Sequence, residues 1–120
     1  MRELLPFADG RAESAMESET RLVMIDGGLP QPELQYLIHG RDGESWRVDF
    51  AWPEVFLAAE YESIAWHAGA QEMLRDKTRR GEIQELGWTI VPIVVDNVRS
   101  RPDALVRRIE GHLNRARMAR

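Results

Sequence analysis

Two segments typical of β-strands lie next to each other in the sequence, with only Pro53 and Glu54 between them. The first, Ser45–Trp52, has a large apolar residue at every second position, which predicts one buried face made of Trp46, Val48, Phe50 and Trp52. The second, 55–62, is mostly apolar, which is typical of a strand covered on both faces. Since so short a connection cannot cross over a sheet, we expect the two strands to be antiparallel neighbours.

Two further strands are expected around this pair. Residues 33–39 alternate in the same way, and their apolar face consists of Leu34, Tyr36 and Ile38. A turn at 40–43 (GRDG) connects this strand to the next one, which extends the antiparallel meander. The fourth strand is predicted at 88–95, and Pro92 within it indicates an edge position or a bulge.

Three helices complete the pattern. Residues 1–12 are predicted to be a loose leader, and a capping box at Ser14–Glu17 is predicted to start the first helix. The second helix is expected over 69–86, and the third begins near Pro102. The order α-β-β-β-α-β-α predicts a single α/β domain over residues 1–120, with a mixed four-stranded sheet flanked by helices.

The helix expected at 69–86 has an irregular apolar pattern. Met73 and Leu74 share one face, whereas Ile83 and Leu86 lie almost opposite. Two arrangements explain this pattern: both sides of the helix are partly covered, or the helix bends near Gly81.

The composition excludes several classes of protein. The chain contains no cysteine, so disulfides and thiolate chemistry are excluded, and no apolar run approaches the roughly 20 residues of a membrane span. The first ten residues contain acids and a proline rather than a hydrophobic stretch, so a cytoplasmic protein is expected.

Charge is distributed unevenly along the chain. From Arg99 onward there are seven arginines and two acids, a local charge of +5, so the rest carries 9 − 18 = −9 of the total of −4. A basic end on an acidic body suits contact with a polyanion, and the alternative is an arginine-rich helix face that only meets solvent.

Three carboxylates are expected to gather on one face of the sheet. Asp49 points away from the large apolar residues of its strand, and Glu60 and Glu62, two residues apart, share a face of the next strand. Clustered carboxylates need a cation or raised pKa values, and ligands that are all oxygen suit Mg²⁺ or Mn²⁺. The alternative is that each acid faces solvent or pairs with an arginine such as Arg47 or Arg75.

The same residues resemble a known family. The stretch RVDFAWPEVFLAAEYES (47–63) is followed by His67, by Asp76 and Arg79 in a D-x-x-R pattern, and by the LGW motif of residues 86–88. In this order, and with the leader 8–17, they resemble small bacterial endonuclease-like domains related to very-short-patch-repair endonucleases, in the PD-(D/E)XK nuclease superfamily. The resemblance extends from about Pro6 to Leu113 and implies a restriction-endonuclease-like fold.

The resemblance also implies roles for individual residues. It makes Asp49 and Glu60 the core metal ligands and brings Glu17 in from the first helix. Glu62 stands where the superfamily usually has a lysine, and His67 would be a catalytic residue that moves a proton. The implied activity is that of an endonuclease that hydrolyses DNA phosphodiester bonds with Mg²⁺ or Mn²⁺.

Arginines are the candidates for nucleic-acid contact. In the second helix Arg75 or Arg79 would neutralise a phosphate, or they pair with acids at helical spacing. In the last helix the candidates are Arg107, Arg108 and Arg115. The expected partners are DNA and a second copy or another protein that carries DNA-binding specificity, with no membrane. Because Glu62 replaces the lysine, the alternative function is a catalytically degenerate nuclease fold that binds nucleic acid or protein.

Overall fold

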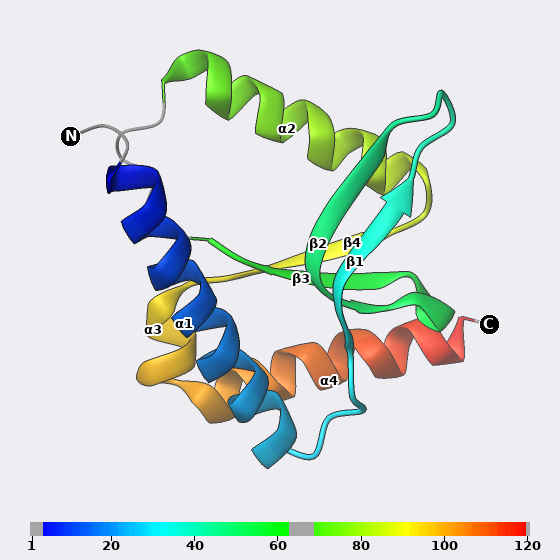
Figure 1. The fold of residues 1–120 in the computed structure, drawn as a ribbon. Coiled ribbons are helices and arrows are strands. Elements are labelled where there is room, and N and C mark those ends of the chain that lie inside the picture. The colour runs from blue at the N-terminus through cyan, green and yellow to red at the C-terminus, as the bar shows by residue number, and fades with distance from the viewer. Residues whose placement is uncertain (1–3, 63–68, 120) are drawn as a thin grey trace.

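The computed structural model describes residues 4–62 and 69–119, which form an α/β fold with one mixed sheet (Figure 1). The elements in chain order are α1 (Leu4–Asp26), β1 (Glu33–His39), β2 (Ser45–Trp52), the short 3-10 helix η1 (Pro53–Val55), β3 (Leu57–Tyr61), α2 (Ala70–Glu85), β4 (Thr89–Ile93), α3 (Val95–Arg99) and α4 (Pro102–Met118). The predicted mixed sheet of four strands with flanking helices is confirmed.

The sheet has the strand order β1-β2-β3-β4. Short connections make β1, β2 and β3 antiparallel, whereas α2 carries the chain back so that β4 pairs with β3 in parallel. Pro92 therefore lies on an edge strand, where its missing N–H leaves no gap in the ladder.

Helices cover both faces of the sheet. On one face α1, α3 and α4 pack on the sheet, and the largest buried side chains there include Met24, Phe50, Trp52, Leu57, Ile93, Leu105, Ile109 and Leu113. On the other face α2 contributes Ile83 to a smaller cluster with Ile38, Val48, Ala51, Ala58 and Trp88. In Figure 1, α2 and α4 accordingly lie on opposite sides of the sheet. No helix among the described residues has the length and apolar character that a bilayer crossing requires.

The first helix differs from the prediction. It begins at Leu4, so residues 4–12 belong to it, and Ser14 lies within the helix rather than at its N-cap. Pro6 does not prevent this start, because the N–H groups of a first helical turn have no partner inside the helix. The helix α1 ends at Asp26, before Gly28, whose φ of 78° suits glycine.

The alternation of β2 also differs from the prediction. Val48 packs on the α2 face, whereas Phe50 and Trp52 pack on the face covered by α1 and α4. The switch occurs at Asp49, opposite Gln35, whose φ of 49° interrupts the regular pleat of β1. The four large residues of β2 therefore do not share one face.

The remaining differences are local. The chain after Pro53 forms η1, and Phe56 follows with a φ of 56°, so β3 begins at Leu57 rather than at residue 55. The helix α3 was not predicted. In α2, Met73 and Leu74 are exposed, and Ile83 alone is buried, so its irregular pattern reflects a helix whose first half stays exposed.

Candidate functional site

The candidate site lies where β2 and β3 separate. Their pairing runs from Trp52 and Leu57 to Phe50 and Ala59. At the next position the carboxylate of Asp49 accepts a hydrogen bond of 2.8 Å from the backbone N–H of Tyr61. A side-chain oxygen thus continues the ladder where the backbones diverge, and this fixes the position of the Asp49 carboxylate.

Gln35 connects Asp49 to the first helix. Its side-chain amide donates to Oε1 of Glu17 at 2.5 Å and lies 3.4 Å from Oδ1 of Asp49. The left-handed backbone of Gln35 accompanies this contact. An amide NH₂ has two donor hydrogens, so one group serves two anions that would otherwise repel each other.

Glu60 is held by Arg79 of α2. The guanidinium donates through Nη1 to Oε1 at 3.1 Å and through Nη2 to Oε2 at 2.6 Å, and Nη2 also donates to the carbonyl of Arg47. This hydrogen bonding to Glu60 is the largest cause of a raised pKa of Arg79, and the charge of Asp49 raises it too. Arg79 therefore lies within the field of both predicted core ligands.

Glu62 has an equivalent partner one residue further along α2. It forms an ion pair with Arg80, whose Nε lies 3.4 Å from Asp76. Arg79 also lies near Asp76, at 3.6 Å, as the helical spacing predicted. Glu60 and Glu62 therefore face α2 together, and their partners are Arg79 and Arg80 rather than Arg47 or Arg75.

The donor chemistry at this point suits a hard divalent cation, because Glu17, Asp49 and Glu60 offer only carboxylate oxygens. Among residues 4–62 and 69–119, however, no group of three or more acids or histidines is arranged as a metal site. The reason is visible in the contacts: Gln35 bridges two of the acids and Arg79 occupies the third. Binding a metal would require Glu60 to exchange Arg79 for the cation.

The other predicted residues are distributed over the molecule. His67 lies outside the described residues. Arg75 is exposed and lines a groove of about 540 Å³ with Arg79, Trp46 and Thr78, between β2 and α2. The predicted residues Arg107, Arg108 and Arg115 belong to α4, which packs on the opposite face of the sheet from α2. Gln35 was missed, because nothing in an alternating strand signals a left-handed residue.

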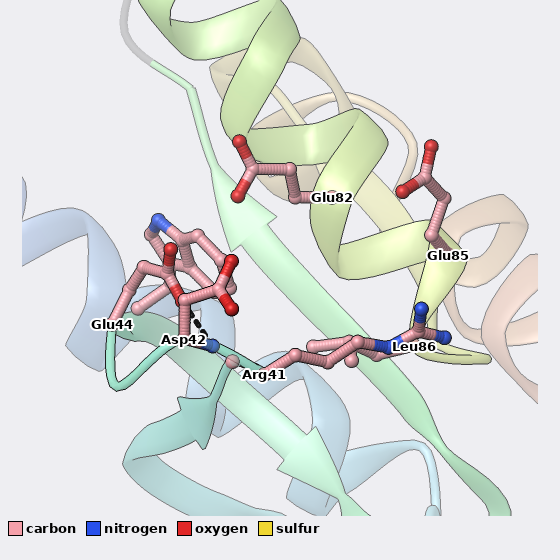
Figure 2. Close-up of a pocket in the computed structure, with 8 residues that line it drawn as sticks. Arg41, Asp42, Glu44, Glu82, Glu85 and Leu86 are labelled. Atoms are coloured by element: carbon pink, nitrogen blue, oxygen red, sulfur yellow. Dashed lines mark hydrogen bonds between the residues drawn. The ribbon is translucent and has the colours of Figure 1, made fainter.

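A second concavity lies between the β1–β2 turn and the end of α2 (Figure 2). It has a volume of about 290 Å³, and its charged lining consists of Arg41, Asp42, Glu44, Glu82 and Glu85. The turn is held by a hydrogen bond from the backbone N–H of Asp42 to Glu44. With four carboxylates and one arginine, this pocket would repel a phosphate.

Comparison with known proteins identifies close relatives. Uncharacterized protein Rv2248 of Mycobacterium tuberculosis (strain ATCC 25618 / H37Rv) and uncharacterized protein MT2308 of strain CDC 1551 / Oshkosh are each 77% identical to the chain over 118 residues. The match covers 98% of this chain and 44% of each relative, so the chain spans less than half of their length. No protein-family model and no solved structure matches. Neither relative's name states an activity, so the function proposed below rests on the residues of this chain.

Proposed function

We propose that the chain is a restriction-endonuclease-like domain that hydrolyses DNA phosphodiester bonds with Mg²⁺ or Mn²⁺. The observation that carries the proposal is that carboxylates from α1, β2 and β3 are linked through Gln35 and Arg79 near the point where β2 and β3 separate. Asp49 is fixed there by the Tyr61 N–H and linked through Gln35 to Glu17, and Arg79 lies near both Asp49 and Glu60.

Each residue has a defined task in this proposal. Asp49 and Glu60 would hold the cation, and Glu17 would complete the set from α1. A bound divalent cation supplies Lewis-acid activation of the phosphoryl oxygen and lowers the pKa of a bound water. On release from Glu60, Arg79 would present a bidentate guanidinium to the phosphate, the cationic role that Glu62 cannot perform. The groove lined by Arg75, Arg79 and Trp46 offers a path for the strand.

The test is a cleavage assay on supercoiled plasmid with Mg²⁺ or Mn²⁺. Asp49→Asn keeps an oxygen that can accept the Tyr61 N–H, so the variant should fold while losing a metal ligand. We expect cleavage to fall by at least about 100-fold, the usual scale for removing one group that stabilises a transition state. Asp42→Asn, on the exposed turn, is the matched control and should cleave as the unaltered chain does.

A second readout separates a lost ligand from a misfolded protein. Calorimetric titration with Mn²⁺ should show binding to the unaltered chain and to Asp42→Asn, and weaker binding to Asp49→Asn. Full cleavage by Asp49→Asn would refute the proposal.

A second candidate is a domain of the same fold that binds nucleic acid or protein without cleaving it. The observation that favours it is that the charges of Glu60 and Glu62 are already neutralised by two arginines, Arg79 and Arg80. In that case the chain would bind DNA, Asp49→Asn and Glu60→Gln would bind it equally well, and the unaltered chain would not cleave it with any metal.

A further inference from the structure

Three basic residues follow one stripe of α4. Arg108, His112 and Arg115 are spaced by four and three residues, so they lie on the same side of the helix. The stripe is on the flank of the helix, beside the positions that bury Leu105, Ile109 and Leu113. Arg108 and His112 are half-buried there, whereas Arg115 is exposed. The stripe therefore borders the core rather than pointing straight into solvent.

Arg108 is fixed in place by the edge of the sheet. Its Nη2 donates a hydrogen bond to the carbonyl of Pro92, on the edge strand β4. The next carbonyl, that of Ile93, faces the interior of the sheet, because it accepts from the N–H of Glu62. One bond uses one of the five donor hydrogens of the Arg108 guanidinium, which leaves donors for a ligand beside β4.

Gly111 makes room for Arg115. A Cβ placed on Gly111 would lie 3.3 Å from Nη1 of Arg115, so the guanidinium folds back over this glycine, and its charge acts on His112. A glycine within a helix costs about 1 kcal/mol relative to alanine. Here its missing side chain leaves room for the Arg115 guanidinium to lie over the helix.

The positive charge of this stripe is not balanced by nearby acids. Ion pairs occupy Arg99 with Glu19 and Arg101 with Asp96, but none among the described residues joins Arg108 or Arg115 to a carboxylate. Burial lowers the pKa of His112, and the charges of Arg115 and Arg108 lower it further. The elements η1, β3, α1 and α3 pack around α4, and no described acid on them raises the pKa of His112.

We propose that Arg108, His112 and Arg115 form a phosphate-binding site that holds the backbone of a nucleic acid along the β4 edge. Two arginine charges beside a core, with no carboxylate partner among the described residues, are unfavourable unless an anion is bound, and planar guanidiniums suit phosphate oxygens. The site reads no bases, so it positions the nucleic acid without selecting its sequence. Naming the nucleic acid as the ligand rests on the proposed function, whereas the phosphate site itself rests on α4.

Arg117 provides a matched control on the same helix. It carries the same charge as Arg108, but it lies about 180° around α4 from Arg108, outside the stripe. The test is fluorescence anisotropy with a short labelled DNA duplex, performed with the full chain in EDTA so that no cleavage occurs. We expect Arg108→Gln and Arg115→Gln each to weaken binding about 5- to 10-fold and to reduce the salt slope by about 1. Arg117→Gln should change the affinity less than about 2-fold.

A Gly111→Ala variant distinguishes a binding role from a structural one. It should raise the unfolding temperature, because alanine favours the helix, and weaken duplex binding, because the Arg115 guanidinium must move. In NMR titrations the duplex should raise the pKa of His112, since a bound phosphate favours the imidazolium. If this helix face only meets solvent, Gly111→Ala should raise the unfolding temperature without weakening duplex binding, and the duplex should not change the pKa of His112.

The outcomes separate this site from the nuclease proposal. Equal binding losses in all three arginine variants would overturn the phosphate site, whatever the cleavage assay shows. Binding of inorganic phosphate to the stripe without binding of the duplex would assign it to a small anion and overturn the nucleic-acid ligand. If no condition gives cleavage while the stripe variants alone lose affinity, the nuclease proposal fails and the phosphate site stands.

Discussion

Both carboxylate oxygens of Glu60 accept hydrogen bonds from Arg79, which joins the middle of α2 to the end of β3. The exposed fractions of the two side chains are 13% and 22%, so water screens the pair only in part. The pair thus has two consequences. It fastens the helix to the sheet, and it neutralises a carboxylate that we assign to metal binding.

Replacing Arg79 with methionine should separate these two consequences. The variant leaves Glu60 without its partner, so we expect the free energy of unfolding to fall by about 1–3 kcal/mol in urea denaturation. If Glu60 is a metal ligand, its affinity for Mn²⁺ should rise at the same time. Arg79→Lys keeps the charge but not the two parallel hydrogen bonds. Its free energy of unfolding should therefore lie between those of the unaltered chain and of Arg79→Met. Stability equal to that of the unaltered chain would contradict the structural role.

Glu62→Lys tests the residue at the superfamily's lysine position. In the fold, the new lysine would face Arg80, so we expect a loss of about 1–3 kcal/mol of unfolding free energy. Adding Arg80→Glu should recover only part of the lost unfolding free energy, because the new carboxylate would lie near Asp76 and be repelled by it. Denaturation of the single and double variants measures this coupling.

The same Glu62→Lys variant also reports on chemistry. In a working site built around the acid, both Mn²⁺ affinity and cleavage should fall. In a degenerate site the lysine would restore some cleavage. If Glu62→Lys and Glu62→Ala both leave metal binding and cleavage unchanged, Glu62 takes no part in the site.

The strands and most helix positions could be predicted because local patterns determine them. The short links around residues 40–43 and 53–54 leave only antiparallel neighbours, and Pro92 belongs on an edge. The helix α3 was missed, because its five residues are too few to show a helical period.

Which face of the sheet each site residue lies on could be predicted only in part. Glu60 and Glu62 share the α2 face, as their spacing requires. The switch at Asp49 was hidden, because the apolar residues of β2 alternate without a break and the irregular backbone lies on the neighbouring strand, at Gln35. The pairing of Glu60 with Arg79 spans 19 residues and depends on how α2 packs, which no local pattern encodes.

Gln35→Glu should make the site depend on a cation. The change replaces the amide shared by Glu17 and Asp49 with a third carboxylate, so like charges meet and we expect a loss of about 1–2 kcal/mol at pH 7. Thermal denaturation should show that Mg²⁺ restores more stability to this variant than it adds to the unaltered chain. Gln35→Asn, which keeps an amide and tolerates a positive φ, is the control. A variant that Mg²⁺ does not rescue would argue against metal binding at this point.

His112 predicts a dependence of stability on pH. Its pKa lies below the ordinary value of 6.5 in the folded protein, chiefly because burial disfavours the charged form, so below about pH 6.5 the unfolded chain takes up a proton that the native chain resists. The free energy of unfolding attributable to this group therefore falls as the pH decreases from about 7 toward the lowered pKa. His112→Gln should remove that part of the slope, and Arg115→Gln should reduce it by removing one repelling charge. Denaturation curves across this range measure the slopes. Adding the DNA duplex should flatten the slope of the unaltered chain, since a phosphate on the stripe would stabilise the imidazolium. A slope that stays the same in His112→Gln would show that other groups set the pH dependence.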